Sequence, residues 1–158
     1  LAVTTIVVSP FEQNCRLVMD KKTGDAVLVD PGDDPQRILK MIRSSGARVT
    51  HILATHGHLD HVGAVKPIQD ALRVPFAIHG GDRPLIALLP EHGLAFGMRG
   101  LKTPTIDLDL AEVSEIPFGS GVIRVVVQSS CEPTMAGRVG RDPVRPRAPA
   151  PLVDAAAR

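Results

Sequence analysis

The residue types best suited to chemistry lie together in the segment 55–61, which reads THGHLDH. Three of the six histidines of the chain, His56, His58 and His61, occur there together with Asp60. Imidazole nitrogen and carboxylate oxygen are ligands that suit Zn²⁺, and also Fe²⁺ or Mn²⁺. Histidines that are merely solvated would not be expected to cluster in this way, so we predict a metal site in this segment.

The spacing of these residues indicates how the site is built. In an extended segment side chains alternate, so His56, His58 and Asp60 would point to one side. On a helix, residues two positions apart diverge and could not share an ion. His61 has the opposite parity, and we expect it to serve a second ion beside the first, with Asp60 turned toward it.

The elements expected around this segment place it in a loop between a strand and a helix. β-branched and apolar residues predict strands over 2–8, 14–19, 26–29, 48–54, 74–78, 106–110 and 121–127. Helical spacing predicts helices from Asp34-Pro35 to Gly46, over 62–72 and over 82–89, the last ended by Pro90. The Gly- and Pro-rich stretch 91–106 is interpreted as a loop. The strand–helix–strand order implies crossover units, at least partly parallel pairing and an α/β fold.

Composition narrows the class of protein. The 158 residues fit one domain, and a net charge of +1 gives no strong field toward nucleic acid or acidic lipid. Four Phe with no Tyr or Trp argue against stacking of bases on aromatic rings. No apolar run approaches the ~18 residues that a membrane span needs, and the start lacks the features of a signal peptide. We expect a cytoplasmic protein in which Cys15 and Cys131 are free thiols.

The composition changes at Gln128. The stretch 128–158 contains five Pro, five Arg and six Ala, and it lacks Ile and Phe. Such a stretch cannot bury much apolar surface. We therefore expect residues 1–127 to form a domain and residues 128–158 to be a poorly ordered tail.

The motif THGHLDHVG resembles the signature of the metallo-β-lactamase superfamily, and specifically its glyoxalase II-like thioester hydrolases. The stretches FEQNC (11–15), AVLVDPG (26–32) and VTHILATHGHLDHVGA (49–64) resemble the same branch, in the family's order. True β-lactamases usually carry another residue where this chain has His61, so a lactamase is less expected. The resemblance implies the N-terminal half of an αβ/βα sandwich, incomplete after about residue 127.

The resemblance also implies roles for single residues. His56 and His58 would bind a first ion, and Asp60 and His61 a second. Both ions would be Zn²⁺, with Fe²⁺ or Mn²⁺ as alternatives. Asp60 would also orient the bridging hydroxide that attacks a small thioester or ester. Asp30, at the end of its strand, resembles the family's aspartate that does not bind the metal itself but braces the metal loop. An Asp before Pro-Gly is also a common turn former.

The chain departs from the family pattern after the strand predicted over 121–127. The family places a third histidine in a loop resembling HxPGH there, then a bridging aspartate and a final histidine. This chain continues with QSSCEPTMAG and has no histidine after His92. We interpret His51, His79 and His92 as structural or solvated. An internal deletion and an out-of-frame reading of the tail both explain the departure.

Three hypotheses for function follow. The first is an active dimetal hydrolase of small thioesters. The second is a truncated remnant that catalyses nothing, because a catalytic zinc normally needs three protein ligands. The third is an iron-dependent sulfur dioxygenase-like protein, which uses related ligands and would need the same histidine that this chain lacks. We expect this chain to be impaired, and we expect half a sandwich to expose a sheet face that favours self-association.

Overall fold

The computed structural model describes residues 1–126 of the chain. The predictions for the tail over 128–158, for Cys131 and for the last residue of the strand expected over 121–127 lie outside the described residues. Among residues 1–126, none of the helices combines the length and the apolar character needed to cross a membrane.

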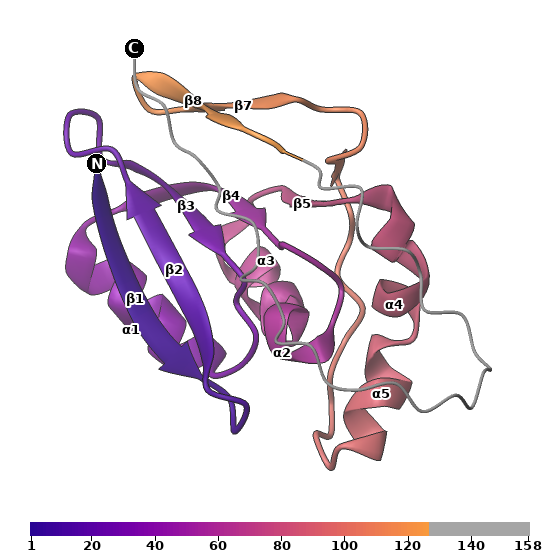
Figure 1. The fold of residues 1–158 in the computed structure, drawn as a ribbon. Coiled ribbons are helices and arrows are strands. Elements are labelled where there is room, and N and C mark those ends of the chain that lie inside the picture. Colours follow the sequence, from indigo (N-terminus) through magenta and orange to yellow (C-terminus); the bar gives the residue numbers. More distant parts are fainter. Residues whose placement is uncertain (127–158) are drawn as a thin grey trace, which may run out of the picture.

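A six-stranded mixed sheet forms the centre of the fold, and its strands lie in the order in which they occur in the chain (Figure 1). The strands are β1 (Ala2–Val8), β2 (Gln13–Met19), β3 (Asp25–Val29), β4 (Arg48–Leu53), β5 (Phe76–Ile78) and β6 (Leu108–Asp109). The first three strands pair antiparallel, whereas β3 to β6 pair parallel. This arrangement confirms the predicted crossover units and the α/β class.

The helices connect the parallel strands. They are α1 (Pro35–Ser45), α2 (Leu59–Val62), α3 (Val65–Leu72), the 3₁₀ turn η1 (Gly80–Asp82), α4 (Arg83–Ala87) and α5 (Leu89–Ala95). Helix α1 agrees with its prediction, because Pro35 occupies the first turn and Gly46 ends the helix at a φ of 68°. Its Ile38, Leu39 and Ile42 are buried at helical spacing.

Alternate residues of the central strands face two separate cores. One core holds Leu28 and Ile52 together with apolar residues of α1 and α3. The other holds Val29 and Leu53 together with residues of a hairpin, β7 (Glu115–Phe118) and β8 (Gly121–Arg124), which lies across the opposite face of the sheet (Figure 1). The central strands are therefore buried on both faces, as parallel strands usually are.

A buried carboxylate ties this hairpin to the sheet. Asp20, in the turn between β2 and β3, accepts hydrogen bonds from the backbone N–H (2.8 Å) and the hydroxyl (2.7 Å) of Ser120. The backbone N–H of Lys22 also donates to it, at 2.9 Å. Gly119, at a φ of 55°, allows the close approach, because a Cβ there would lie 2.5 Å from an Asp20 carboxylate oxygen. These hydrogen bonds, that of Lys22 above all, lower the pKa of Asp20 from 3.8 to about 2.

The edge strand β1 carries apolar side chains that remain exposed to solvent. The side chains of Val3 and Val7 on β1 are 59% and 47% exposed. Exposed apolar residues on an edge strand favour contact with another chain. The expected self-association through an exposed sheet face stays a prediction.

Several predicted boundaries were wrong, for local reasons. The helix expected over 62–72 is two helices, because the chain turns at Gly63 and Ala64, where the Ala64 N–H donates to the carbonyl of Pro31 at 3.0 Å. Pro90 lies in the first turn of α5 and does not end a helix, since that turn needs no N–H from it. Helix α5 thus occupies part of the loop expected over 91–106. Strand β7 was not predicted, although Ile116 and Phe118 alternate with exposed residues.

Candidate metal centre

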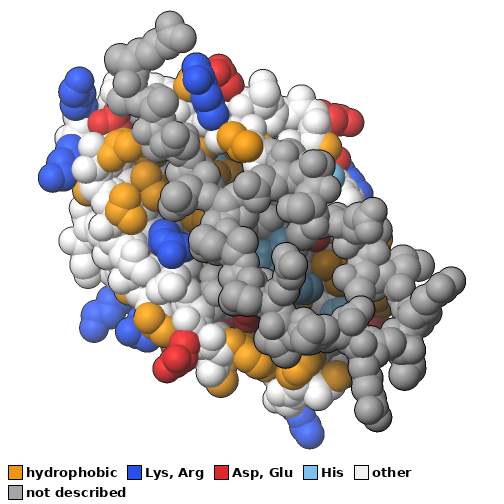
Figure 2. Space-filling model, viewed as in Figure 1, with side chains coloured by type: hydrophobic (Ala, Val, Ile, Leu, Met, Phe, Trp, Pro, Cys, Tyr) orange, Lys and Arg blue, Asp and Glu red, His pale blue; other side chains and the backbone are white. Residues whose placement is uncertain are grey.

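The metal-binding segment predicted over 55–61 follows β4 and lies at the carboxyl end of the parallel strands. The backbone N–H of Asp30 donates to the carbonyl of Leu53 at 2.9 Å, so β3 and β4 end side by side. His58 is still extended, with a φ of −70° and a ψ of 148°, and it immediately precedes α2. In Figure 2, histidine side chains lie near the middle of the viewed face, close to hydrophobic side chains.

The helix after this segment begins earlier than the predicted residue 62, so the alternation assumed through Asp60 and His61 was wrong. Helix α2 begins at Leu59, because the carbonyl of His58 accepts the N–H groups of His61 (2.9 Å) and Val62 (3.2 Å). Asp60 and His61 therefore lie on a helical turn, and alternation along a strand does not govern where they point.

The helical turn brings His61 back toward the loop. The ring centroids of His56 and His61 lie 3.9 Å apart, and those of His56 and His58 lie 4.6 Å apart. A carboxylate oxygen of Asp60 lies 3.6 Å from Nε2 of His61. The structure thus brings together all four residues predicted as ligands, with His61 beside His56 and not set apart from it.

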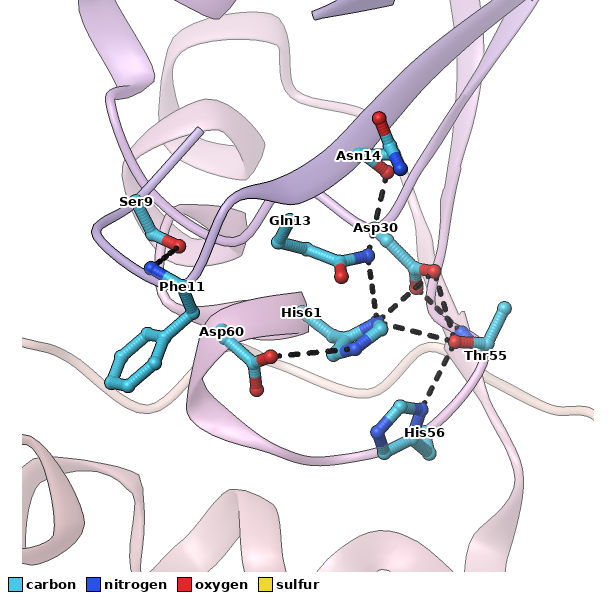
Figure 3. A network of polar contacts seen from close by, with 9 residues as sticks. All are labelled: Ser9, Phe11, Gln13, Asn14, Asp30, Thr55, His56, Asp60 and His61. Carbon is cyan, nitrogen blue, oxygen red and sulfur yellow. Dashed lines mark hydrogen bonds and ion pairs between the residues drawn. The ribbon is translucent and has the colours of Figure 1, made fainter. Parts of the chain in front are cut away.

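Asp30 contacts this cluster from the end of β3, as Figure 3 shows. Asp30 is buried, and its carboxylate accepts hydrogen bonds from the backbone N–H (2.7 Å) and the hydroxyl (2.9 Å) of Thr55. The same carboxylate lies 3.1 Å from Nδ1 of His61, and the side-chain amide of Gln13 lies 3.2 Å from that nitrogen. Donation of Nδ1–H to Asp30 would leave Nε2 of His61 free to act as a ligand.

Through Thr55, Asp30 also orients the imidazole ring of His56. Its hydroxyl oxygen lies 3.1 Å from Nδ1 of His56. Because this hydroxyl donates its hydrogen to Asp30, its oxygen can accept Nδ1–H of His56, which leaves Nε2 free. Asp30 therefore orients two of the three clustered histidines, one directly and one through Thr55.

Two glycines allow α2 to approach the strand end, and the sequence analysis did not assign them a role. A Cβ on Gly32 would overlap the backbone carbonyl of Asp60. A Cβ on Gly63 would in turn overlap the backbone carbonyl of Gly32. Both glycines lie in stretches that resemble the family, AVLVDPG and HVGA. Only the tertiary contact explains why no side chain fits at these positions.

Burial makes the centre of the cluster favour neutral imidazole. It lowers the pKa of His56, and the neighbouring His61 and His58 lower it further, partly offset by Asp30 and Asp60. Metal ligands must be deprotonated, so this environment suits a ligand. Burial also raises the pKa of the Cys15 thiol to about 12, with Asp30 adding to the effect, which agrees with a structural cysteine.

The donor chemistry fits a metal, but the described residues do not complete a site. Within residues 1–126, no group of three or more His, Cys, Asp or Glu side chains is arranged to hold a metal ion. The ligand roles of His56, His58, Asp60 and His61, and the bracing role of Asp30 in a metal-bound protein, therefore stay predictions.

The other histidines lie apart from the cluster or at its border. His51 lies in β4, with Nδ1 3.1 Å from the hydroxyl of Thr50. His79 caps η1, its Nδ1 accepting the N–H of Gly81 at 3.0 Å. His92 lies in α5 and lines a cleft that it shares with His58.

Comparisons with known proteins identify the family. Residues 8–127 match the family model described as the metallo-beta-lactamase superfamily. The chain is 34% identical over 108 residues to the hydroxyacylglutathione hydrolase GloC of Haemophilus influenzae, a match that covers 68% of this chain and 48% of that protein. It is 41% identical over 83 residues to a hydroxyacylglutathione hydrolase of Anaeromyxobacter dehalogenans, covering 50% of this chain and 32% of the relative.

Solved structures show the same fold. The crystal structure of the BLEG-1 B3 metallo-β-lactamase matches with a TM-score of 0.67 at 24% identity, covering 78% of this chain and 59% of the other. The di-iron-bound form of TTHA1623 matches with a TM-score of 0.63 at 29% identity, covering 77% and 59%. The chain spans roughly a third to three fifths of these relatives, which agrees with an incomplete sandwich. The chain belongs to the metallo-β-lactamase superfamily, with glyoxalase II-like hydroxyacylglutathione hydrolases among its relatives.

Proposed function

We propose that this chain carries the N-terminal half of a dimetal centre that hydrolyses a small thioester or ester. The observation that supports this most directly is the cluster of three imidazoles and Asp60 at the carboxyl end of the parallel strands, oriented by the buried carboxylate of Asp30. Ligands bind at this end of α/β sheets. The hydroxyacylglutathione hydrolases among the relatives support a thioester as the substrate class.

In this proposal His56 and His58 hold the first ion, and Asp60 and His61 hold the second. When bound, such a pair of ions supplies a water-derived nucleophile at neutral pH and stabilises charge that develops on the carbonyl oxygen. The chain itself contributes the orientation of its imidazoles through Asp30 and Thr55. Zn²⁺ suits these ligands, and iron is supported as an alternative by the di-iron form of one structural neighbour.

We further propose that the 158-residue chain by itself is catalytically impaired. It offers two side chains to each ion, whereas catalytic zinc is normally held by three protein ligands. Its sequence contains no histidine after His92 that could complete either shell. The expected result is weak metal binding and slow or absent turnover, unless a second copy of the chain contributes ligands.

The test uses the full chain and two histidine variants. The chain is loaded with Zn²⁺, Fe²⁺ or Mn²⁺, bound metal is measured by mass spectrometry, and hydrolysis of a glutathione thioester is followed. We expect less than one ion per chain, with the remaining binding lost in His58→Ala and retained in His79→Ala, whose ring caps η1. Stoichiometric metal with rapid turnover would refute the impairment, and binding unaffected by His58→Ala would refute the metal centre. Light scattering on the same samples detects a dimer.

A further inference from the structure

A cleft of about 370 Å³ borders the candidate metal centre. Two residues of the centre, His58 and Asp60, form part of its wall. The remaining lining is Phe11, Leu59, Leu85, His92 and Phe96. Its size is at the small end of the range for ligand pockets, which suits one substituent of a substrate and not a whole cofactor.

The outer wall of this cleft is made by two phenylalanines from distant parts of the chain. The rings of Phe11 and Phe96 pack edge to face, with centroids 6.0 Å apart. Each ring is nevertheless largely exposed, at 49% for Phe11 and 63% for Phe96. Two adjoining exposed aromatic rings at the border of a polar site gain free energy when an apolar group covers them.

The turn between β1 and β2 holds Phe11 in this place. Ser9 and Glu12 adopt positive φ values of 64° and 54°, and the N–H of Glu12 donates to the carbonyl of Ser9 at 3.2 Å. The Ser9 hydroxyl accepts the N–H of Phe11, also at 3.2 Å. Figure 3 shows the Phe11 ring next to Asp60, and both residues line the cleft. The turn therefore holds the backbone of Phe11 beside the predicted ligands.

The charges of the lining restrict what can bind. Among the described residues that line the cleft there is no Lys or Arg. Among these described lining residues, an anionic substituent would find no Lys or Arg with which to pair. An uncharged apolar chain would instead bury itself against Phe11, Leu59 and Phe96.

We propose that Phe11 and Phe96 form a subsite that binds an uncharged apolar chain attached to the scissile carbonyl. This inference rests on the proposed hydrolase function, because that function places the carbonyl beside His58 and Asp60. Phe11 and Phe96 are then residues that determine substrate specificity. Longer apolar chains bind more tightly until the cleft is filled.

Binding can be tested without turnover. The probes are neutral ketones in which a methylene replaces the thioester sulfur, lengthened either on the acyl side or on the side of the replaced thiol. The chain has only four Phe and no Tyr or Trp, so ring-labelled Phe gives four resolvable sets of NMR signals. Phe76 and Phe118 are buried in the two cores and serve as internal controls.

We expect saturable shifts of the Phe11 and Phe96 signals only, and a Kd that falls about fourfold per added methylene, the equivalent of about 0.8 kcal/mol. The series that shows this dependence, acyl or thiol, identifies which side of the carbonyl the cleft binds. Phe11→Ala and Phe96→Ala should remove the dependence on length. Leu94→Ala, which removes an exposed apolar side chain from α5 outside the cleft, should keep it.

A Kd that does not change with chain length in either series would overturn the subsite. Shifts of all four Phe signals together would overturn it as well, because they would indicate non-specific binding. Length-dependent binding in a chain that neither binds metal nor hydrolyses thioesters would refute the proposed function and leave the subsite standing. Hydrolysis at a rate that does not depend on chain length would refute the subsite and leave the proposed hydrolase function standing.

Discussion

The bracing of the histidine cluster by Asp30 can be tested by removing its carboxylate. In Asp30→Ala, the backbone N–H and the hydroxyl of Thr55 and Nδ1 of His61 all lose their acceptor. The side chain of Asp30 is 3% exposed, so water does not readily replace it. Because Asp30 has a φ of 52°, an alanine there is also strained, whereas Asn tolerates this conformation almost as well as Asp.

The magnitude follows from these contacts. Each hydrogen bond to a charged group contributes about 1.5–3 kcal/mol, and a buried N–H left without an acceptor costs about 1–3 kcal/mol. The left-handed conformation adds about 1–2 kcal/mol for alanine. Removing the carboxylate also removes the cost of burying it, so the sum is partly offset. We expect the free energy of unfolding to fall by about 3–5 kcal/mol.

Urea denaturation followed by far-UV circular dichroism measures this change, because the chain has no Trp or Tyr to report by fluorescence. Asp30→Asn is the matched control, since it keeps an acceptor for the Thr55 N–H and tolerates the positive φ. We expect it to cost about 1–2 kcal/mol, mainly from an amide group facing His61. Equal stability of Asp30→Ala, Asp30→Asn and the unchanged chain would refute the reasoning.

Three further predictions concern other parts of the fold. Gly32→Ala should lower the Tm more than Gly24→Ala. A Cβ at Gly32 meets the Asp60 carbonyl, whereas at Gly24 no atom lies within 4 Å and alanine bears only the cost of a φ of 77°, about 1–2 kcal/mol. Equal losses would contradict the close approach of α2. The pKa of Asp20 is lowered from 3.8 to about 2, so its stabilising effect is complete above pH 3.8 and is lost as the pH falls toward 2. Asp20→Asn should therefore flatten the fall of Tm over this range, and an unchanged fall would exclude Asp20 as its source. The Cys15 thiol, with its pKa raised to about 12, should resist a thiol reagent at neutral pH until the chain unfolds, as measured in a Cys131→Ser background; rapid labelling of the folded protein would contradict its burial.

Local patterns in the sequence were sufficient for much of the fold. Helix α1 was predicted with its ends, because Pro35, the buried Ile38 and Ile42 and the terminal Gly46 all act within one helix. The strands β1 to β4 were predicted to within a residue or so at each end. The ligand types in the segment 55–61 were also evident, since clustering of histidines is a property of the sequence itself.

Contacts between distant residues needed the tertiary structure. The approach of α2 to the strand end depends on the contact between Gly32 and the backbone of Asp60. These two residues belong to different elements, so no sequence periodicity relates them. The hairpin β7–β8 is held by two hydrogen bonds that Ser120 donates to Asp20, one hundred residues away in the sequence.

The sequence by itself determined the family, the candidate donor residues and the strand that precedes them. Only the tertiary structure decided that His61 turns back onto His56 and Asp30, and that Phe11 meets Phe96 at the border of the cluster. The physical reason is that periodicity and capping report forces within one element, whereas the direction of a side chain at the end of an element depends on what packs against it from elsewhere in the chain.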